Sequence, residues 1–267
     1  MTPYRTLVAA AALCLLLLTV SQGPARAQSP APSPAHTPVP STWGGDQPFS
    51  VIDLFRRQFN GVVTKNWFQR EGAPDVPPIK KGVYVAAGVK WYLEDCPDGP
   101  ALFMLKGAGS KFDCAELTSV TLNTGKGYEN VGIKAAGIHF LHTLNPGPGL
   151  KLATEKPPVV FSYVVHYVDG TTEKIPVHWG VEVGDWFPPA GPVADLPQAQ
   201  AIEFLPPGGE PERRAVLYAM YWANPKPDVA MVTFDIVAAT NREGADLGAP
   251  AVMALTVPKG APAQPKP

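Results

Sequence analysis

The sequence lacks the motifs by which many enzymes are identified. It contains no G-x-S-x-G nucleophile elbow, no H-E-x-x-H zinc motif and no glycine-rich loop typical of phosphate binding. The short glycine clusters at 107–109 and 125–127 lie between candidate strands and are interpreted as turns. A pair of acids at glycosidase separation cannot be chosen from sequence alone. We therefore expect a non-catalytic protein, and an unrecognised hydrolase is the least favoured hypothesis.

Long apolar runs are absent except near the start of the chain. Arg5 precedes an uncharged apolar run over 7–20, and Ala25-Arg26-Ala27 supplies the small-x-small pattern of a signal peptidase site. The run is too short for a comfortable membrane span. Residues 1–27 are therefore predicted to be a signal peptide, and the protein is predicted to be exported, either periplasmic or secreted, with no membrane span in the mature chain.

Charged residues are few and are not grouped by sign. They make up 17% of the chain, and without Arg5 and Arg26 the balance is 20 basic against 23 acidic residues, or −3. No cluster of Lys and Arg is present to attract polyanions. The charge pattern gives no case for nucleic acid or an anionic membrane as a partner.

Cysteine is scarce, with three in the whole chain. Cys14 lies inside the predicted signal peptide, which leaves Cys96 and Cys114 for an oxidising compartment. An even count there favours a Cys96–Cys114 disulfide over free thiols, with a stabilisation of about 3 kcal/mol in the chain-entropy model. A metal site would need further soft ligands, and none lies close in sequence.

Helical periodicity is almost absent, and only Val51–Phe59 could form a helical turn or, alternatively, a strand and a turn. The rest consists of short β-type runs separated by Gly, Pro, Asn and Asp. The 32 prolines suit strand edges and loops better than helices. We predict an all-β fold, a single-domain antiparallel β-sandwich of jelly-roll type. Its eleven strands are predicted at 83–86, 89–93, 102–105, 119–122, 131–141, 159–168, 171–177, 201–204, 214–223, 229–238 and 251–257.

The strongest local signal is Asp169-Gly170, which lies between two runs rich in Val, Ile, Thr and Tyr. Such a dipeptide predicts a hairpin with a two-residue type I′ turn. This turn fixes the register and sets His166 opposite Glu173 as a cross-strand pair that could respond to pH. An ordinary pair with no function is the simpler interpretation. The other predicted pairs are Val168–Thr171, Tyr167–Thr172, Val165–Lys174 and Val164–Ile175.

The two ends of the chain have a different composition from its centre. Residues 28–42 are rich in Pro, Ser and Ala and predict a disordered, extended spacer. Residues 258–267 have the same character and predict a disordered tail. The β-sandwich domain is expected to span 43–257.

Several blocks along this domain form a recognisable series. They include F-L-H-T at 140–143, Y-V-V-H-Y-V-D-G-T at 163–171, G-D-W at 184–186 and Y-W-A-N-P at 221–225. V-I-D-L at 51–54 precedes them and P-A-V-M-A-L-T at 250–256 follows. The order resembles a galactose-binding-domain-like β-sandwich module of exported bacterial proteins, often attached to glycan-processing enzymes. The resemblance implies a jelly roll and carbohydrate binding.

A candidate ligand site uses three tryptophans. Trp179, Trp186 and Trp222 could each present a flat indole to the apolar face of a sugar ring, with Asp185 and Asn224 bonding the hydroxyls. The alternative is that these large aromatic side chains pack in the core.

Metal sites receive little support from the spacing of possible ligands. His139 and His142 are three residues apart on a predicted strand, so they should point to opposite faces rather than share a metal. A structural calcium ion held by Asp53, Asp169 or Asp185 is a weaker hypothesis, because no dense run of acidic ligands is present. No cofactor is predicted apart from this ion.

The function expected from the sequence is therefore binding of a glycan or polysaccharide by an exported, non-catalytic module. The alternative is a structural or protein-interaction module of the bacterial cell envelope, with a cell-envelope protein as its partner. Sugar binding that is lost in Trp→Ala variants would favour the first.

Overall fold

The computed structural model describes the residues that form the sheets and most of their connections. They all lie in one of the two units into which the chain divides, His36–Pro267. The predicted signal peptide, the predicted spacer, Asp53 and Cys114 lie outside the described residues. The described ranges are 49–51, 61–62, 78–93, 95–96, 99–105, 119–123, 132–148, 150, 156–206, 208–239 and 247–258.

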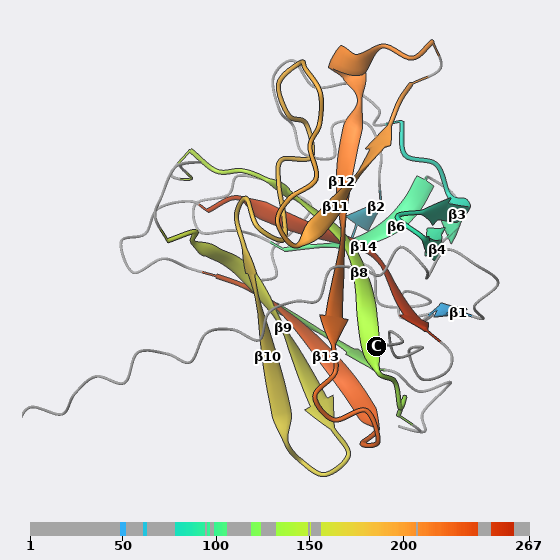
Figure 1. The fold of residues 1–267 in the computed structure, drawn as a ribbon, viewed down its shortest axis with the longest axis vertical. Helices are drawn as coiled ribbons and strands as arrows, with labels where there is room; N and C mark the ends of the chain where they lie inside the picture. Colours follow the sequence, from blue (N-terminus) through green and yellow to red (C-terminus); the bar gives the residue numbers. More distant parts are fainter. Residues whose placement is uncertain are drawn as a thin grey trace, which may run out of the picture. The chain divides into compact units, whose positions relative to one another are not determined.

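The described residues form an antiparallel all-β structure, as the sequence predicts, and all eleven predicted strands are present (Figure 1). One short 3-10 turn occurs at Pro211–Arg213, and no helix in the described part is long and apolar enough to cross a membrane. The strands are β1 (Phe49–Val51), β2 (Gly61–Val62), β3 (Gly82–Ala86), β4 (Val89–Leu93), β5 (Asp95–Cys96), β6 (Gly99–Met104), β7 (Ser119–Asn123), β8 (Gly137–Asn145), β9 (Val159–Tyr167), β10 (Thr172–His178), β11 (Ala199–Phe204), β12 (Ala215–Ala223), β13 (Met231–Ala238) and β14 (Ala249–Pro258).

The strands are arranged in two main sheets and a hairpin. The larger sheet has the order β11-β12-β8-β14-β6-β2, with β1 beside β14 and β5 beside β6. The smaller has four strands in the order β10-β9-β13-β7, and β3 pairs with β4 in a separate two-stranded sheet. Neighbours in all three are antiparallel. The jelly-roll connectivity stays a prediction.

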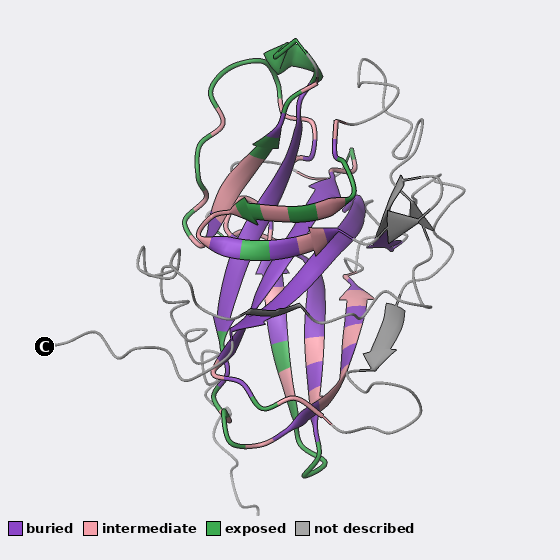
Figure 2. Ribbon diagram, turned by 90° about the vertical axis from the view of Figure 1, so that its right-hand side faces the viewer, coloured by how far each residue is buried: buried purple, intermediate pink, exposed green. Residues whose placement is uncertain are grey.

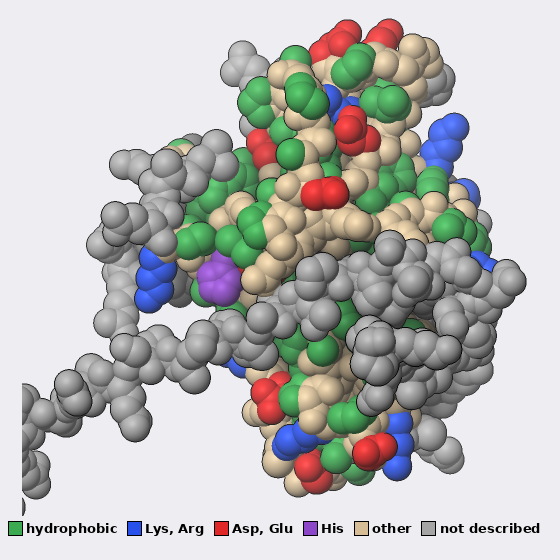
Figure 3. Space-filling model, viewed as in Figure 1, with side chains coloured by type: hydrophobic (Ala, Val, Ile, Leu, Met, Phe, Trp, Pro, Cys, Tyr) green, Lys and Arg blue, Asp and Glu red, His purple; other side chains and the backbone are tan. Residues whose placement is uncertain are grey.

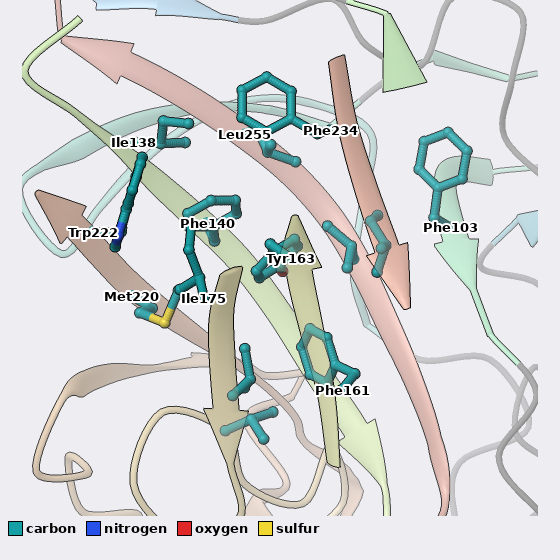
Figure 4. Close-up of a cluster of buried hydrophobic side chains, with 14 of the residues drawn as sticks. Phe103, Ile138, Phe140, Phe161, Tyr163, Ile175, Met220, Trp222, Phe234 and Leu255 are labelled. Carbon is teal, nitrogen blue, oxygen red and sulfur yellow. The ribbon is translucent and has the colours of Figure 1, made fainter. Parts of the chain in front are cut away.

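The main core lies between the two larger sheets (Figure 4). On β9, the odd-numbered residues from Phe161 to Tyr167 point inward, as the two-residue period of a strand requires. Phe140 from β8 stacks on Tyr163 with ring centroids 4.0 Å apart. The apolar residues of one sheet therefore bury those of the other, which is the arrangement of a sandwich.

The opposite face of the larger sheet is also covered. Trp91 and Leu93 of β4 are fully buried in a second apolar cluster with Leu217 of β12 and Met253 of β14. The hydroxyl of Thr256 donates to the carbonyl of Lys90 at 3.0 Å and ties this hairpin to β14. Every residue of β8 and β14 is therefore buried, which Figure 2 shows as unbroken purple strands.

The β9–β10 hairpin is present, but its predicted register is wrong by one residue. His166 pairs with Thr172 instead of Glu173, because the loop has three residues, Val168 to Gly170. The amide of Gly170 donates to the carbonyl of Tyr167, and only Gly170 has a positive φ, of 81°. These features define a type I turn followed by a G1 bulge.

A two-residue turn with positive φ at both positions does occur, at Ala87-Gly88 between β3 and β4. The φ angles there are 54° and 68°. The type I′ geometry predicted for Asp169-Gly170 therefore describes the other hairpin. In the β9–β10 loop, Asp169 instead accepts hydrogen bonds from the amide and the hydroxyl of Thr171, at 3.0 and 2.6 Å.

The bulge predicts the response of the β9–β10 loop to mutation. Gly170→Val is expected to lower the free energy of unfolding by about 1–2 kcal/mol, because a β-branched residue is strained at positive φ. Gly170→Asn should cost less, because Asn tolerates this conformation. Urea unfolding of both variants measures the difference. Equal stability of the two variants would contradict the bulge, since a Cβ at Gly170 meets no atom within 4 Å.

Several strand boundaries differ from expectation, including the starts of β6 at Gly99 instead of 102 and of β11 at Ala199 instead of 201, and two predictions remain untested. Strand β8 covers Gly137–Asn145 instead of 131–141, and β14 extends through Pro258. The possible helix at 51–59 lies outside the described residues except for Val51, which ends β1. Cys96 lies in β5, and the disulfide stays a prediction because Cys114 is not described.

Candidate functional site

The three predicted stacking tryptophans are core residues. Trp179, Trp186 and Trp222 expose 6%, 1% and 5% of their surface. Trp179 and Trp222 belong to the cluster between the two main sheets, whereas Trp186 belongs to the cluster on the far side of the larger sheet. Figure 4 shows Trp222 beside Ile138 within this core. Because stacking on a sugar needs an accessible ring face, the predicted site at these three indoles is not supported.

Asn224 and Asp185, the two polar residues predicted for that site, also have structural roles. Asn224 is 6% exposed, and its Oδ1 accepts the hydroxyl of Tyr167 at 2.6 Å and the amide of Lys226 at 2.9 Å. Its Nδ2 donates to the carbonyl of Ala135 at 2.8 Å. Asp185 Oδ1 accepts the amide of Phe187 at 2.9 Å. These amide and carboxylate groups therefore hold loops in place.

The calcium hypothesis gains no ligand set in the described part of the chain. No group of three or more His, Cys, Asp or Glu side chains there is arranged to hold a metal ion. Both oxygens of Asp169 have partners, because Oδ1 bonds Thr171 and Oδ2 lies 3.9 Å from the ammonium of Lys226. Asp53 lies outside these residues.

His139 and His142 point to opposite faces of β8, as predicted from their spacing. His142 contacts Tyr163 in the main core, whereas His139 lies against Trp91 and Tyr221 on the other face. Burial lowers the pKa of His139 to about 3 and that of His142 to about 4. Both imidazoles are therefore neutral core groups near pH 7.

The protonation of His142 can be deduced from its partners. Its Nε2 lies 2.9 Å from the carbonyl oxygen of Glu182, which can only accept, so Nε2 carries the proton. Nδ1 then accepts the hydroxyl of Tyr163 at 2.8 Å. A second proton on Nδ1 would remove that acceptor, so the neutral form satisfies every polar atom of the ring.

The outer face of the four-stranded sheet carries polar side chains from three of its strands. This outer face is formed by the residues of β9, β10 and β13 whose side chains point away from the main core. Successive same-face residues pair across the three strands. The rows are Thr172–His166–Thr233, Lys174–Val164–Asp235 and Pro176–Ser162–Val237.

An oriented imidazole lies in the first row of the outer face. His166 Nε2 lies 2.7 Å from Asp235 Oδ2, and the side chains are 35% and 25% exposed. The other ring nitrogen, Nδ1, has no hydrogen-bond partner in the part of the chain that the structure describes. The carboxylate of Asp235 therefore holds the ring of His166, and the other ring nitrogen remains available for a hydrogen bond.

A second imidazole of the same kind lies where β10 ends. His178 Nδ1 lies 3.0 Å from Glu182 Oε2, which also accepts the amide of His178 at 2.7 Å. Glu182 is 2% exposed, whereas His178 is 25% exposed. Nε2 of His178 has no partner within the described ranges. Thr172, which lies opposite His166, and His178 are six positions apart on β10, which corresponds to about 20 Å at 3.3 Å per residue.

These two imidazole–carboxylate pairs were missed from the sequence for different reasons. The predicted register of β9 and β10 was wrong by one residue, so it placed His166 opposite Glu173. In the structure, the partner of His166 is Asp235 of β13, on the other side of β9. The parity of buried residues could have corrected it, because Ile175 and Tyr163 are both core residues and must share a face. The His178–Glu182 pair depends on the turn at Gly180, which has a φ of 73°.

No family model, curated protein or solved structure matches this chain. The side chains of the described residues are therefore the basis for its proposed function.

Proposed function

We propose that this protein is an exported, non-catalytic carbohydrate-binding module that holds a glycan or polysaccharide along the outer face of its four-stranded sheet. The observation that carries the proposal is the half-exposed His166–Asp235 pair, at 2.7 Å. Sugar hydroxyls both donate and accept hydrogen bonds, and an imidazole held by a carboxylate offers a fixed polar atom to them. The resemblance to galactose-binding-domain-like modules agrees with this function, and the jelly-roll topology is part of the proposal.

The composition of the outer face supports an extended ligand. Thr172 and Thr233 flank His166, and Lys174 and Asp235 flank Val164, so hydroxyl, ammonium and carboxylate groups alternate with an aliphatic side chain. Short side chains on rigid strands lose little entropy when a ligand binds. The imidazole of His178 lies about 20 Å farther along the strands, by the rise per residue. It would contact a different sugar unit of the same polysaccharide molecule.

The proposal predicts the effect of substitutions on the outer face. His166→Gln and Asp235→Asn should each weaken polysaccharide binding at least tenfold, the loss expected for one hydrogen bond to a charged or oriented group. The melting temperature of His166→Gln should stay close to that of the original protein, because the side chain is 35% exposed. Affinity electrophoresis with soluble galactan, xylan and mannan, and pull-down with peptidoglycan sacculi, measure the binding.

Lys90→Gln provides a matched control. Lys90 is exposed on β4, which covers the other face of the larger sheet, so the variant should bind as the original protein does. Unchanged binding in a His166→Gln/His178→Gln double variant would contradict the proposed face. Saturable binding to a cell-envelope protein, with no retention by any polysaccharide, would instead support the protein-interaction function.

A further inference from the structure

We propose that the free edge of β3 is a self-association site, through which two copies of this protein pair their β3 strands antiparallel about a two-fold axis. β3 pairs with β4 on one side, and no described strand pairs with it on the other. An unpaired strand edge is a template for another strand, so this interface is independent of the glycan face proposed above.

The side chains on β3 differ from those of a protected edge. Val83 and Val85 are 58% and 74% exposed, and Figure 2 shows this strand with exposed bands. The edge strand β10, by contrast, contains Pro176, which has no amide hydrogen to offer. At the edge strand β11, the amide of Ala201 donates to the carboxylate of Asp195 at 2.8 Å.

The turn determines which backbone groups of β3 face outward. Ala86 and Val89 flank the two-residue loop and therefore form a hydrogen-bonded pair. The alternation along an antiparallel ladder then directs the amide and carbonyl of Tyr84 toward β4. The same alternation leaves the backbone groups of Val83 and Val85 directed away from β4, at the free edge.

The sequence of β3 fits a second copy of itself. Gly82-Val83-Tyr84-Val85-Ala86 has valines placed symmetrically about Tyr84. In a two-fold antiparallel pair centred on Tyr84, Val83 of the first copy lies opposite Val85 of the second. By symmetry, Val85 of the first copy lies opposite Val83 of the second. Each of these two valine pairs can exchange both backbone hydrogen bonds, because the outward groups belong to these residues.

The charges near the strand agree with this register. Lys80 and Lys81 precede β3 and would lie opposite Gly88 and Ala87 of the second copy, respectively, so the lysines of the two copies do not meet. The four valines would form one continuous apolar strip across the joined strands. Like charges placed opposite each other would have opposed such a pair.

The test is the concentration dependence of the mass of the full chain in sedimentation equilibrium, from micromolar to near-millimolar protein. A small interface of this type should give a weak monomer–dimer equilibrium. Val85→Lys should weaken dimerisation at least tenfold. Val83→Pro should do the same, because it removes an outward amide hydrogen.

Val168→Lys is the matched control, because Val168 is also an exposed valine, at 66%, but lies in the β9–β10 loop. It should dimerise as the original protein does, and far-UV circular dichroism should confirm that all three variants are folded. A monomer at every concentration, or full dimerisation of Val85→Lys, would overturn the proposal. Binding of an extended peptide from another protein at β3, without dimerisation, would also overturn it.

Discussion

Replacing Trp186 with alanine is expected to lower the free energy of unfolding by about 3–5 kcal/mol, the range for truncation of a buried tryptophan. The indole is 1% exposed and packs against Phe187 with ring centroids 5.4 Å apart. Its Nε1 also donates to Asn145 Oδ1 at 3.0 Å, so the truncation removes a hydrogen bond. For a chain of this size, the melting temperature should fall by about 6–20 °C.

Trp186→Phe and Val168→Ala serve as comparisons in the same thermal unfolding measurement. The phenylalanine keeps part of the packing and loses the hydrogen bond, so its effect should be intermediate. Val168 is 66% exposed, and its truncation should change stability by less than about 0.5 kcal/mol. A Trp186→Ala variant that melts normally and fails to bind polysaccharide would contradict the core position and favour a stacking role.

Stability is expected to fall as the pH is lowered from about 6.5 toward 4, because His142 is neutral and buried in the folded state. Burial lowers its pKa from 6.5 to about 4. Above pH 6.5, neither state binds the proton, and the ring contributes no pH dependence. Between these values, the unfolded state binds a proton that the folded state does not, which favours unfolding by about 1.4 kcal/mol per pH unit. Below pH 4, both states bind it.

The total loss from His142 is about 3 kcal/mol over this window, and His139 adds to it because burial lowers its pKa to about 3. The free energy of unfolding in urea, measured from pH 7 to pH 4, gives the slope. His142→Gln should be less stable at pH 7, since an amide cannot fully replace the bonds to Tyr163 and Glu182. Its slope should be shallower by about 1.4 kcal/mol per pH unit. An unchanged slope would contradict the assignment.

Strand positions could be predicted because short runs of β-branched and aromatic residues end at turn residues. The run 159–168, for example, became β9 at Val159–Tyr167 with an error of one residue at its end. Local composition determines such strands and accounts for the lack of α-helices among the described residues, and this pattern implies a sandwich. β8 begins at Gly137 instead of 131 because Ile133 pairs with Met231 of the smaller sheet, a tertiary contact that no local pattern contains.

The site could not be predicted because burial depends on which layers cover a residue. Trp186 precedes a loop rich in Pro and Gly, which is a typical place for an exposed aromatic side chain. It is buried because the far side of the larger sheet carries a second apolar cluster, to which the distant β3–β4 hairpin contributes. The His166–Asp235 pair joins residues 69 positions apart, and only the correct pairing of β9 with β13 brings them together.

The larger sheet is covered on both sides, and this limits how the protein can change over evolutionary time. Along β8 and β14, a new side chain meets packed atoms whichever way it points, so neither strand offers a position where variation is free. New binding properties must then arise in the two outer layers, where the proposed glycan face and the proposed β3 interface lie. The larger sheet would stay constant between them, so the residues of one outer layer could change without altering the other outer layer.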